Sequence, residues 1–575
     1  MKKFWNITNY FKDLTKFNIL TLGTLIFLIL AGIFSGQNSI PPIDRDEARF
    51  AQASRQMVQS NDYVNIKFQD EIRAKKPIGI YWLQAFSSKV FGSEEIGSFR
   101  VPSLFSSLIS ILFVGFLTRL IFPLYQTIVV TLLFASSITF MGEAHLAKTD
   151  ATLLCLICIQ QYYLLKLILN ENTSFRVKYL YPVIIWFTFS FGVLVKGPLS
   201  FAILIPTVIL FCFFQKSLDL IRVLKPILGI IICAFIILPW FFAIDEATQG
   251  VFLQKAFNED FFSKLQSGQE GHGALPGTHL LILSIAIWPI ATFLPCLILF
   301  CIQNKNNTVV QFLVSWIVPF WIIIEIIPTK LFHYSLPVIP AIAILAIGGM
   351  FQFKSNIKKI QNTLLKKIIY FSSVLFGLGG VVMGIGLFYT CYKFNVEKDL
   401  SITFLTFLII LITILVFSLS LLLIFNIRAL NKISQKFFYN LPLSIIALGA
   451  TFNIINFNLI IPKLDYLFPS KTLANKIELI NPETITSAGY HEPSLVFLLN
   501  GNVLLSKPHE AAIFMAEGKK NISLIEKKSL SEFLEAIKEL NLKVKIVDTI
   551  KGYNIAKGRH VEINIFENQK FDQSN

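Results

Sequence analysis

Acidic and basic side chains gather in one stretch near the N-terminus, Pro41–Phe91, within a chain that is otherwise rich in apolar residues. Asp46 lies three residues before Arg49, so a helix would place both side chains on one face. Farther along, Lys75-Lys76-Pro77 offers cations at a rigid turn, and fixed cations are what a phosphate group requires. A carboxylate beside them could orient a nucleophile or accept its proton. A surface ion pair between Asp46 and Arg49 would explain the same spacing without chemistry.

Further ionisable residues are predicted at the ends of hydrophobic stretches. Such groups are unfavourable at membrane depth, so each indicates a functional site with a partner, although the ends of spans also simply meet water. If the stretches cross a membrane, these residues reach the same face as the Pro41–Phe91 stretch: Asp150, Lys196, Glu246 and Lys330. The sequence therefore predicts one charged site that is built from several separate connections.

The composition indicates which class of protein must position these side chains. Of the 575 residues, 54% are apolar and only 15% are charged, whereas a globular enzyme carries about 25% charged residues. We identify thirteen apolar stretches as candidate membrane spans. The sixth is short, so twelve or fourteen spans also fit the sequence. The net charge of +16 falls largely in short loops between them, which favours a role in membrane orientation over nucleic-acid binding. The stretches are 19–34, 101–122, 126–141, 151–169, 179–195, 199–214, 226–244, 279–302, 309–327, 335–351, 368–391, 402–425 and 438–461.

The distribution of lysine and arginine residues sets the expected orientation of these stretches. The positive charges cluster in alternate loops, which favours a cytoplasmic N-terminus and places the loop 37–98 and the C-terminal tail outside. Apolar residues recur at helical spacing over Asp46–Gln59 and Ile78–Val90, so the loop is expected to carry two interfacial helices. A second outer loop, 245–278, is rich in glycine and proline and carries His272.

The last part of the chain, residues 462–575, changes to short apolar runs that alternate with an amphipathic helical run. About 110 residues suffice for a small α/β domain. We therefore expect a membrane domain over 1–461 and a soluble α/β domain over 462–575. The segment Gly489-Tyr490-His491-Glu492-Pro493 is expected either as a surface turn or as a cover over the charged site.

Taken together, the motifs resemble those of integral-membrane GT-C glycosyltransferases. Asp46-Glu47-Ala48-Arg49-Phe50-Ala51 resembles a D-E-x-R-[YF]-A signature, and Lys76-Pro77-Ile78-Gly79-Ile80-Tyr81-Trp82 resembles K-P-x-x-x-Y-W. The resemblance is to the lipid A 4-amino-4-deoxy-L-arabinose transferases and the protein O-mannosyltransferases, over roughly residues 40–345. Further matches follow in the same order: Arg100-Val101-Pro102, Asp150, Val195-Lys196-Gly197, Thr329-Lys330-Leu331 and Tyr334-Ser335-Leu336-Pro337.

This resemblance implies a GT-C fold. It also implies an enzyme that transfers a hexose or pentose from a polyprenyl-phosphate donor. The acceptor would be lipopolysaccharide, lipid A or another cell-envelope molecule at the periplasmic face of a bacterial inner membrane. The likeness makes Asp46 the principal catalytic carboxylate and Asp150 a second acidic candidate. The remaining expected roles are donor or phosphate binding by Arg49, Lys76, Lys196 and Lys330, cavity shaping by Tyr81 and Tyr334, and loop contacts by Glu47, Glu246 and His272.

One position departs from the family pattern. Aminoarabinose transferases often have a metal-binding glutamate directly before the motif lysine, and here that residue is Lys75. We therefore expect no cofactor and assign no metal ligands, and the departure at Lys75 leaves open whether a metal is bound. A lipid-linked sugar flippase would also need charged residues in a helix bundle, but transporters place them near the midplane within repeats, and the sequence shows no repeat. A protein O-glycosyltransferase would differ only in its acceptor.

Overall fold

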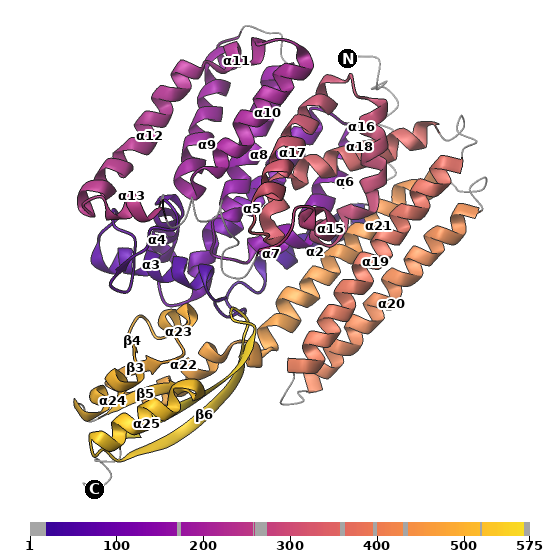
Figure 1. The fold of residues 1–575 in the computed structure, drawn as a ribbon. Helices are drawn as coiled ribbons and strands as arrows, with labels where there is room; N and C mark the ends of the chain where they lie inside the picture. The colour runs from indigo at the N-terminus through magenta and orange to yellow at the C-terminus, as the bar shows by residue number, and fades with distance from the viewer. Residues whose placement is uncertain are drawn as a thin grey trace.

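A helix bundle forms the larger part of the protein, and a smaller part that contains a sheet lies at one end of it (Figure 1). The structure is a computed structural model that describes residues 19–169, 174–256, 258, 273–356, 363–394, 400–428, 435–517 and 520–568. His272 lies outside the described residues, so its expected loop contact stays a prediction.

The helices of the bundle identify a multi-pass membrane protein. Within the described ranges, eight helices are long and apolar enough to cross a membrane, or ten if each of two bent helix pairs is one span. Shorter apolar helices of 10–17 residues accompany them, and the number thirteen stays a prediction. The helices are α2 (Ile19–Phe34), α5 (Ile96–Arg119), α6 (Leu124–Ala135), α7 (Ile138–Ala144), α8 (Asp150–Leu169), α9 (Tyr181–Lys196), α10 (Leu199–Gln215), α11 (Asp219–Leu224), α12 (Pro226–Ala247), α13 (Val251–Lys255), α15 (Thr278–Ala286), α16 (Leu294–Gln303), α17 (Thr308–Ile326), α18 (Ile339–Asn356), α19 (Thr363–Phe394), α20 (Leu400–Arg428) and α21 (Gln435–Ile454).

Two of the expected apolar stretches contain a sharp bend. The stretch 279–302 divides into α15 and a second helical segment that meet at 108°, and Pro289 lies at the break, where it supplies no backbone N–H. The stretch 126–141 bends by 62° between α6 and α7. At that bend the hydroxyl groups of Ser136 and Ser137 donate to nearby backbone carbonyls, which stabilises the interruption.

The loop between α2 and α5 contains the two predicted helices, α3 (Asp46–Ser60) and α4 (Gly79–Phe91), and a short hairpin of β1 (Lys67–Phe68) and β2 (Glu71–Ile72). Phe50, Ala53 and Met57 are among the apolar residues that recur at helical spacing in α3, and all three are buried. Helix α4 lies close to α9, because a Cβ atom at Gly79 would come within 2.9 Å of the Leu194 backbone. This approach places the segment that carries Lys76 beside the end of α9, where Lys196 lies.

The C-terminal part is built on a five-stranded sheet with strand order β4-β3-β5-β7-β6. Strands β3, β4 and β5 run parallel, whereas β7 is antiparallel to both of its neighbours. In Figure 1 the hairpin of β6 and β7 reaches toward the helix bundle. The elements are α22 (Pro469–Ile480), β3 (Thr484–Ala488), α23 (Pro493–Leu498), β4 (Leu504–Ser506), α24 (Pro508–Glu517), β5 (Asn521–Glu526), α25 (Leu530–Glu539), β6 (Val544–Asn554) and β7 (Arg559–Asn568).

Candidate active site

Asp46 is the first residue of α3, and its side chain is 66% exposed beside a buried arginine. Arg73 Nη2 lies 3.5 Å from Asp46 Oδ1. Arg73 is itself held in place, since its Nε donates to the Tyr81 hydroxyl at 3.2 Å and its guanidinium carbon lies 5.1 Å from the centre of the Phe50 ring. Tyr81 is fully buried. It therefore positions Arg73, and its expected role in shaping the cavity stays a prediction.

Several cations act on the Asp46 carboxylate. Desolvation raises the pKa of Asp46, but the positive charges of Arg73, Lys76, Lys148 and Arg49 outweigh it, so the pKa is lower than its ordinary value. The carboxylate is therefore ionised at neutral pH. Arg49 and Lys76 thus lie within electrostatic reach of Asp46.

A second, more buried group of charges surrounds Asp150, the first residue of α8. Lys196 Nζ, at the end of α9, lies 2.5 Å from Asp150 Oδ1, and His333 Nε2 lies 3.6 Å from the same oxygen. The other ring nitrogen of His333 lies 3.6 Å from Glu143 Oε1, which also pairs with Lys148 Nζ at 3.0 Å. The His333 ring therefore lies between two carboxylates, each of which is also paired with a lysine.

Lys148 connects the two groups of charges. Its ammonium group interacts electrostatically with Glu143, Asp150 and Asp46, and His333 also interacts with both aspartates. The carboxylates from α3 and α8 therefore belong to one charged region, which we call the carboxylate site. It comprises Asp46, Arg49, Arg73, Lys76, Glu143, Lys148, Asp150, Lys196 and His333.

Sequence reasoning did not assign a role in the site to Arg73, Glu143, Lys148 or His333. Two of them stood next to recognised positions, because Lys148 comes two residues before Asp150 and His333 directly precedes Tyr334. Glu143 lies two residues after the apolar stretch 126–141, where an ionisable side chain indicates a functional partner. The positions of these three residues in the sequence were therefore the signals from which their roles could have been predicted.

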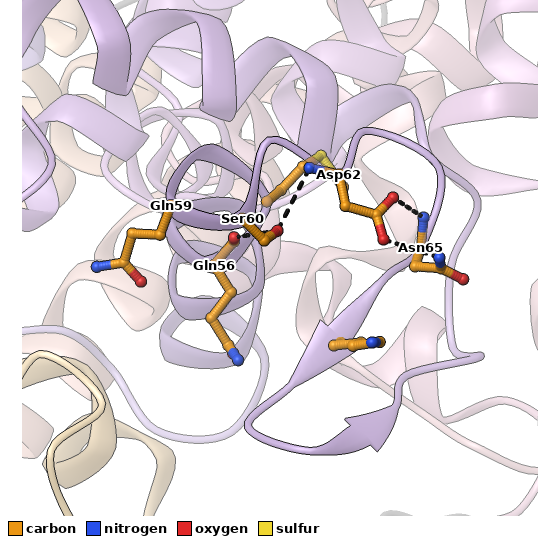
Figure 2. Close-up of a pocket in the computed structure, with 7 residues that line it drawn as sticks. Gln56, Gln59, Ser60, Asp62 and Asn65 are labelled. Carbon is orange, nitrogen blue, oxygen red and sulfur yellow. Dashed lines mark hydrogen bonds between the residues drawn. The ribbon is translucent and has the colours of Figure 1, made fainter.

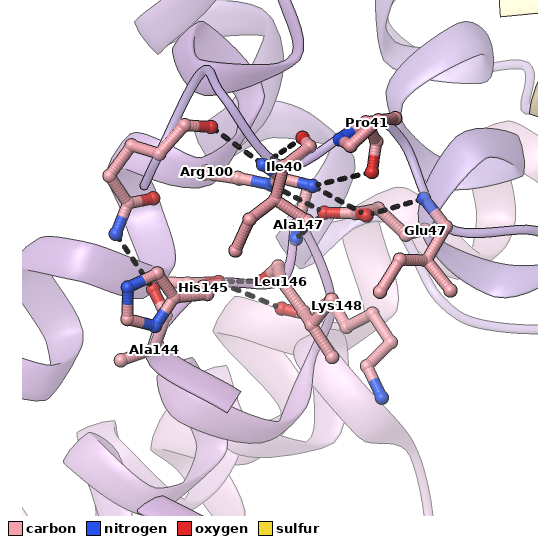
Figure 3. A network of polar contacts seen from close by, with 12 residues as sticks. Ile40, Pro41, Glu47, Arg100, Ala144, His145, Leu146, Ala147 and Lys148 are labelled. Atoms are coloured by element: carbon pink, nitrogen blue, oxygen red, sulfur yellow. Dashed lines mark hydrogen bonds and ion pairs between the residues drawn. The ribbon is translucent and has the colours of Figure 1, made fainter. Parts of the chain in front are cut away.

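Glu47 has a structural role within the first loop, and its expected role as a loop contact of the site stays a prediction. Its side chain is 1% exposed and accepts hydrogen bonds from Arg100 Nε at 2.8 Å and Nη2 at 2.9 Å. The backbone N–H groups of Ile43 and Ala147 donate to the same carboxylate at 2.9 and 2.8 Å. Figure 3 shows this network between the loop, α5 and the segment before α8. Glu47 thus fixes the start of α3 against the segment that leads to Asp150.

Three further expected residues lie outside this network. Lys330 is buried and donates to the carbonyl groups of Ile324 at 2.8 Å and Glu325 at 2.6 Å, at the end of α17. This geometry gives Lys330 a structural contact, and its expected phosphate contact stays a prediction. The Tyr334 ring centre lies 5.3 Å from that of His333, at the edge of the site. Glu246 has an exposed side chain in the last turn of α12.

The carboxylate site also contains a geometry that could hold a metal ion. One ligand atom each from Glu143, Asp150 and His333 lies within 4.8 Å of the others. However, the ammonium groups of Lys148 and Lys196 already pair with these two carboxylates. A divalent cation would have to displace both lysines, so the donor set fits an internal ion-pair network better than a metal.

A polar pocket of about 360 Å³ lies at the opposite end of α3 from Asp46 (Figure 2). Its carboxylate, Asp62, already accepts hydrogen bonds from the backbone N–H groups of Val64 and Asn65 and from the Asn65 side chain. Helix α3 has 15 residues, so about 20 Å separates the pocket from the start of the helix. We assign the pocket no role in the carboxylate site.

Asp44, just before α3, should make the stability of the protein depend on pH. Its pKa is raised from 3.8 to about 7, chiefly by burial and further by Glu492, whereas hydrogen bonds from Ser494 and the charge of Arg49 oppose the change. The folded state therefore binds this proton more tightly than the unfolded chain does. The resulting stabilisation is present at low pH and is lost as pH rises through about 7.

Replacing Asp44 with asparagine keeps an oxygen acceptor for Ser494 and removes the charge. We expect Asp44→Asn to stabilise the protein at pH 8. The free energy of unfolding should then lose the pH dependence that this residue causes between pH 5 and 8. Thermal unfolding of wild type and Asp44→Asn across that pH range measures the difference in their stability. All other titrating groups are common to the two proteins, so a difference that changes with pH comes from Asp44. A difference between the two proteins that does not change with pH would contradict the assignment.

The helix bundle, with a carboxylate at the start of α3 and cations around it, has the GT-C fold. The structure matches the crystal structure of ArnT from Cupriavidus metallidurans bound to undecaprenyl phosphate with a TM-score of 0.71, over 95% of this chain and 97% of that chain, at 16% identity. The apo state of the same protein gives a TM-score of 0.70, over 96% and 98% of the two chains, also at 16% identity. At this identity the match establishes the fold.

Sequence relatives make the resemblance more specific. Residues 75–242 match the family described as dolichyl-phosphate-mannose-protein mannosyltransferase. Undecaprenyl phosphate-alpha-4-amino-4-deoxy-L-arabinose arabinosyl transferase from Yersinia pestis is 26% identical over 60% of this chain, and the enzyme of that name from Pectobacterium atrosepticum is 24% identical over the same share. The matched region spans 61% of the length of each relative. The resemblance to the GT-C transferases that the motifs indicate is therefore confirmed.

Proposed function

We propose that the protein is a glycosyltransferase that moves a sugar from a polyprenyl-phosphate donor to lipid A, lipopolysaccharide or another cell-envelope acceptor. The observation that carries the proposal is the Asp46–Arg73 pair within electrostatic reach of Lys76 and Arg49, at one end of a membrane bundle. The names of the sequence relatives and the undecaprenyl phosphate bound to the structural relative support this class of donor. Loop charge favours a cytoplasmic N-terminus and a periplasmic site in the inner membrane.

The cations of the carboxylate site suit the departure of a lipid phosphate. As the bond between the anomeric carbon and the phosphate oxygen breaks, negative charge grows on the phosphate. Lys76 and Arg49 can stabilise that charge, because preorganised cations act most strongly where charge develops. Lys196 is paired with Asp150, so Asp150 either orients it toward the phosphate or balances its charge before the donor binds.

Asp46 is suited to act in its ionised, negatively charged form. Because its pKa is lowered, it is a weak base, which favours orienting the acceptor or steadying positive character at the anomeric carbon over removing a proton. The acceptor oxygen would bond to the anomeric carbon as the bond from that carbon to the phosphate oxygen breaks, and the proton of an acceptor hydroxyl would pass to the released phosphate or to water. Direct displacement of this kind inverts the configuration of that carbon.

Comparison of envelope glycolipids from cells with and without the gene tests the proposed function. We expect mass spectrometry to show a glycolipid that carries one additional sugar only when the gene is present, and unchanged glycolipid masses would contradict a lipid acceptor. A polyprenyl-phosphate sugar that accumulates in the deletion strain would identify the donor.

Lys76 provides a prediction about donor binding. We expect Lys76→Ala to raise the donor concentration needed for half-maximal rate by about tenfold to a hundredfold, because a hydrogen bond to a charged group contributes about 1.5–3 kcal/mol. Initial rates over a series of donor concentrations measure this effect. Lys75→Ala is the matched control, since Lys75 is adjacent and exposed. The same donor requirement in Lys76→Ala and wild type would count against a phosphate contact.

A protein acceptor is the second candidate, and the family match over residues 75–242 favours it. It requires the same donor chemistry with a serine or threonine hydroxyl as the nucleophile. Parallel reactions with lipid A and with a serine-rich peptide distinguish the two acceptors, since only the true acceptor gains the mass of the sugar. A flippase would add no mass to either one.

A further inference from the structure

The residues just before Asp46 are tied to the C-terminal part of the chain. Arg45 Nη2 donates to the carbonyl of Ala556, in the turn between β6 and β7, at 2.7 Å. One residue earlier, Asp44 Oδ1 accepts from the backbone N–H of Ser494 at 2.7 Å. Two adjacent residues of the turn that leads into α3 are thus held by two separate elements of the C-terminal part.

The backbone conformation of Arg45 makes these contacts consequential. Arg45 has φ 62° and ψ −81°, a conformation that residues other than glycine rarely adopt and that persists only when the surroundings enforce it. Asp46 follows directly, so rotation about the Arg45 backbone would carry the start of α3 away from Arg73. The 3.5 Å separation between Asp46 and Arg73 therefore depends on the turn that Arg45 forms.

The surface against which Arg45 is held is itself well fixed. Arg55, buried on α3, donates to the carbonyl of Phe497 at 2.6 Å, and its guanidinium carbon lies 3.8 Å from the centre of the Phe497 ring. Phe497 also packs with Ala48 and Ala51 of α3. Helix α23 therefore forms a continuous contact with the first turns of α3.

The hairpin turn is fixed to the start of the same helix. Asn554 Nδ2 and Lys557 Nζ, on either side of Ala556, both lie 2.7 Å from Glu492 Oε1, and Glu492 is 2% exposed. Tyr490 is buried as well. Most of the segment 489–493 is therefore buried where the C-terminal part meets the first loop, and the expectation of a surface turn is wrong.

From these contacts we infer that Arg45 is a positioning residue for Asp46. We also infer that the β6–β7 turn and α23 support the carboxylate site by holding Arg45 and Asp44 in place. This inference rests on the proposed function, since it gives Asp46 a role in transfer. The C-terminal part would then hold the Arg45 turn in the conformation that keeps the Asp46 carboxylate beside Arg73.

Gln69 offers a matched control for Arg45. It also has positive φ, 52°, and its side-chain Nε2 donates to a backbone carbonyl of the C-terminal part, that of Val503, at 2.8 Å. Gln69 lies in the β1–β2 turn, far along the chain from Asp46. Gln69→Ala thus removes the same kind of contact at the same kind of backbone position without touching the turn before α3.

The test compares the full-length Arg45→Ala, Arg45→Lys and Gln69→Ala proteins in detergent. We expect Arg45→Ala to lower kcat by about tenfold or more with an unchanged KM for the donor, because misplacement of a reacting group affects the chemical step. Arg45→Lys keeps a donor and should recover part of kcat, and Gln69→Ala should match wild type. Hydrogen exchange should quicken over residues 43–50 in Arg45→Ala alone.

The exchange measurement separates this inference from the proposed function. If wild type transfers no sugar, the proposed function fails, and faster exchange at 43–50 in Arg45→Ala alone still supports the anchoring of the turn. Wild-type exchange and wild-type kcat in Arg45→Ala would overturn the inference. Equal losses of kcat in Arg45→Ala and Gln69→Ala would also overturn it, since they would show general docking in place of positioning.

Discussion

Asp46→Asn is expected to lower the rate of sugar transfer by about 10²- to 10³-fold, the range found when one group that stabilises charge in the transition state is removed. The substitution keeps the size of the side chain and removes the negative charge that faces Arg73. The loss should appear in kcat at saturating donor, measured as initial rates of product formation by purified protein.

Asp70→Asn is the matched control for this experiment, because Asp70 is an exposed aspartate in the same loop. It should transfer sugar at the wild-type rate. Both variants should elute as monodisperse protein and unfold at temperatures close to that of wild type, since Asp46 is largely exposed. Full activity in Asp46→Asn would remove this carboxylate from the mechanism.

Glu47→Gln is expected to destabilise the protein by about 3–5 kcal/mol, the loss typical when one partner of a buried ion pair is removed. Arg100 is fully buried, and Glu47 is the carboxylate that pairs with it. Glutamine can still accept a hydrogen bond, but the guanidinium charge would remain in a site of low dielectric. Thermal and denaturant unfolding of the purified protein measure the change.

Glu94→Gln tests whether this effect requires burial. Glu94 is an exposed glutamate near the end of the same loop, so its neutralisation should change stability by less than about 0.5 kcal/mol. Equal stability of Glu47→Gln and wild type would contradict the structural role of the Glu47–Arg100 pair. Transfer by Glu47→Gln should also fall, because Glu47 joins the start of α3 to the segment before α8 through Ala147.

Helices α3 and α4 could be predicted from the sequence because their apolar residues recur at helical spacing and the loop contains local turn signals. The breaks near Ser136 and Pro289 were missed, because the sequence stays hydrophobic across both. Hydrophobicity does not report a change in the direction of the helix axis. A proline or a pair of serines is tolerated within many membrane helices. Local composition therefore predicted the presence of apolar helices better than their continuity.

The candidate site shows the same division between local and long-range information. Asp46 and Glu47 are adjacent acidic residues of one motif, yet one is exposed beside cations and the other is buried against Arg100. Helical periodicity separates two such neighbours only when the partner surface is known. The contact between His333 and Asp150 joins residues far apart in the chain, and neither residue has a local pattern that indicates the other.

The mass of the acceptor after reaction tests the central claim most directly. Purified protein in detergent would be incubated with a polyprenyl-phosphate sugar and an envelope lipid extract, and the acceptor and the free polyprenyl phosphate would be measured by mass spectrometry. We predict that an acceptor gains one sugar for each polyprenyl phosphate released with wild type, and that neither product forms with Asp46→Asn. Release of polyprenyl phosphate without a glycosylated acceptor, or equal product from both proteins, would contradict the account.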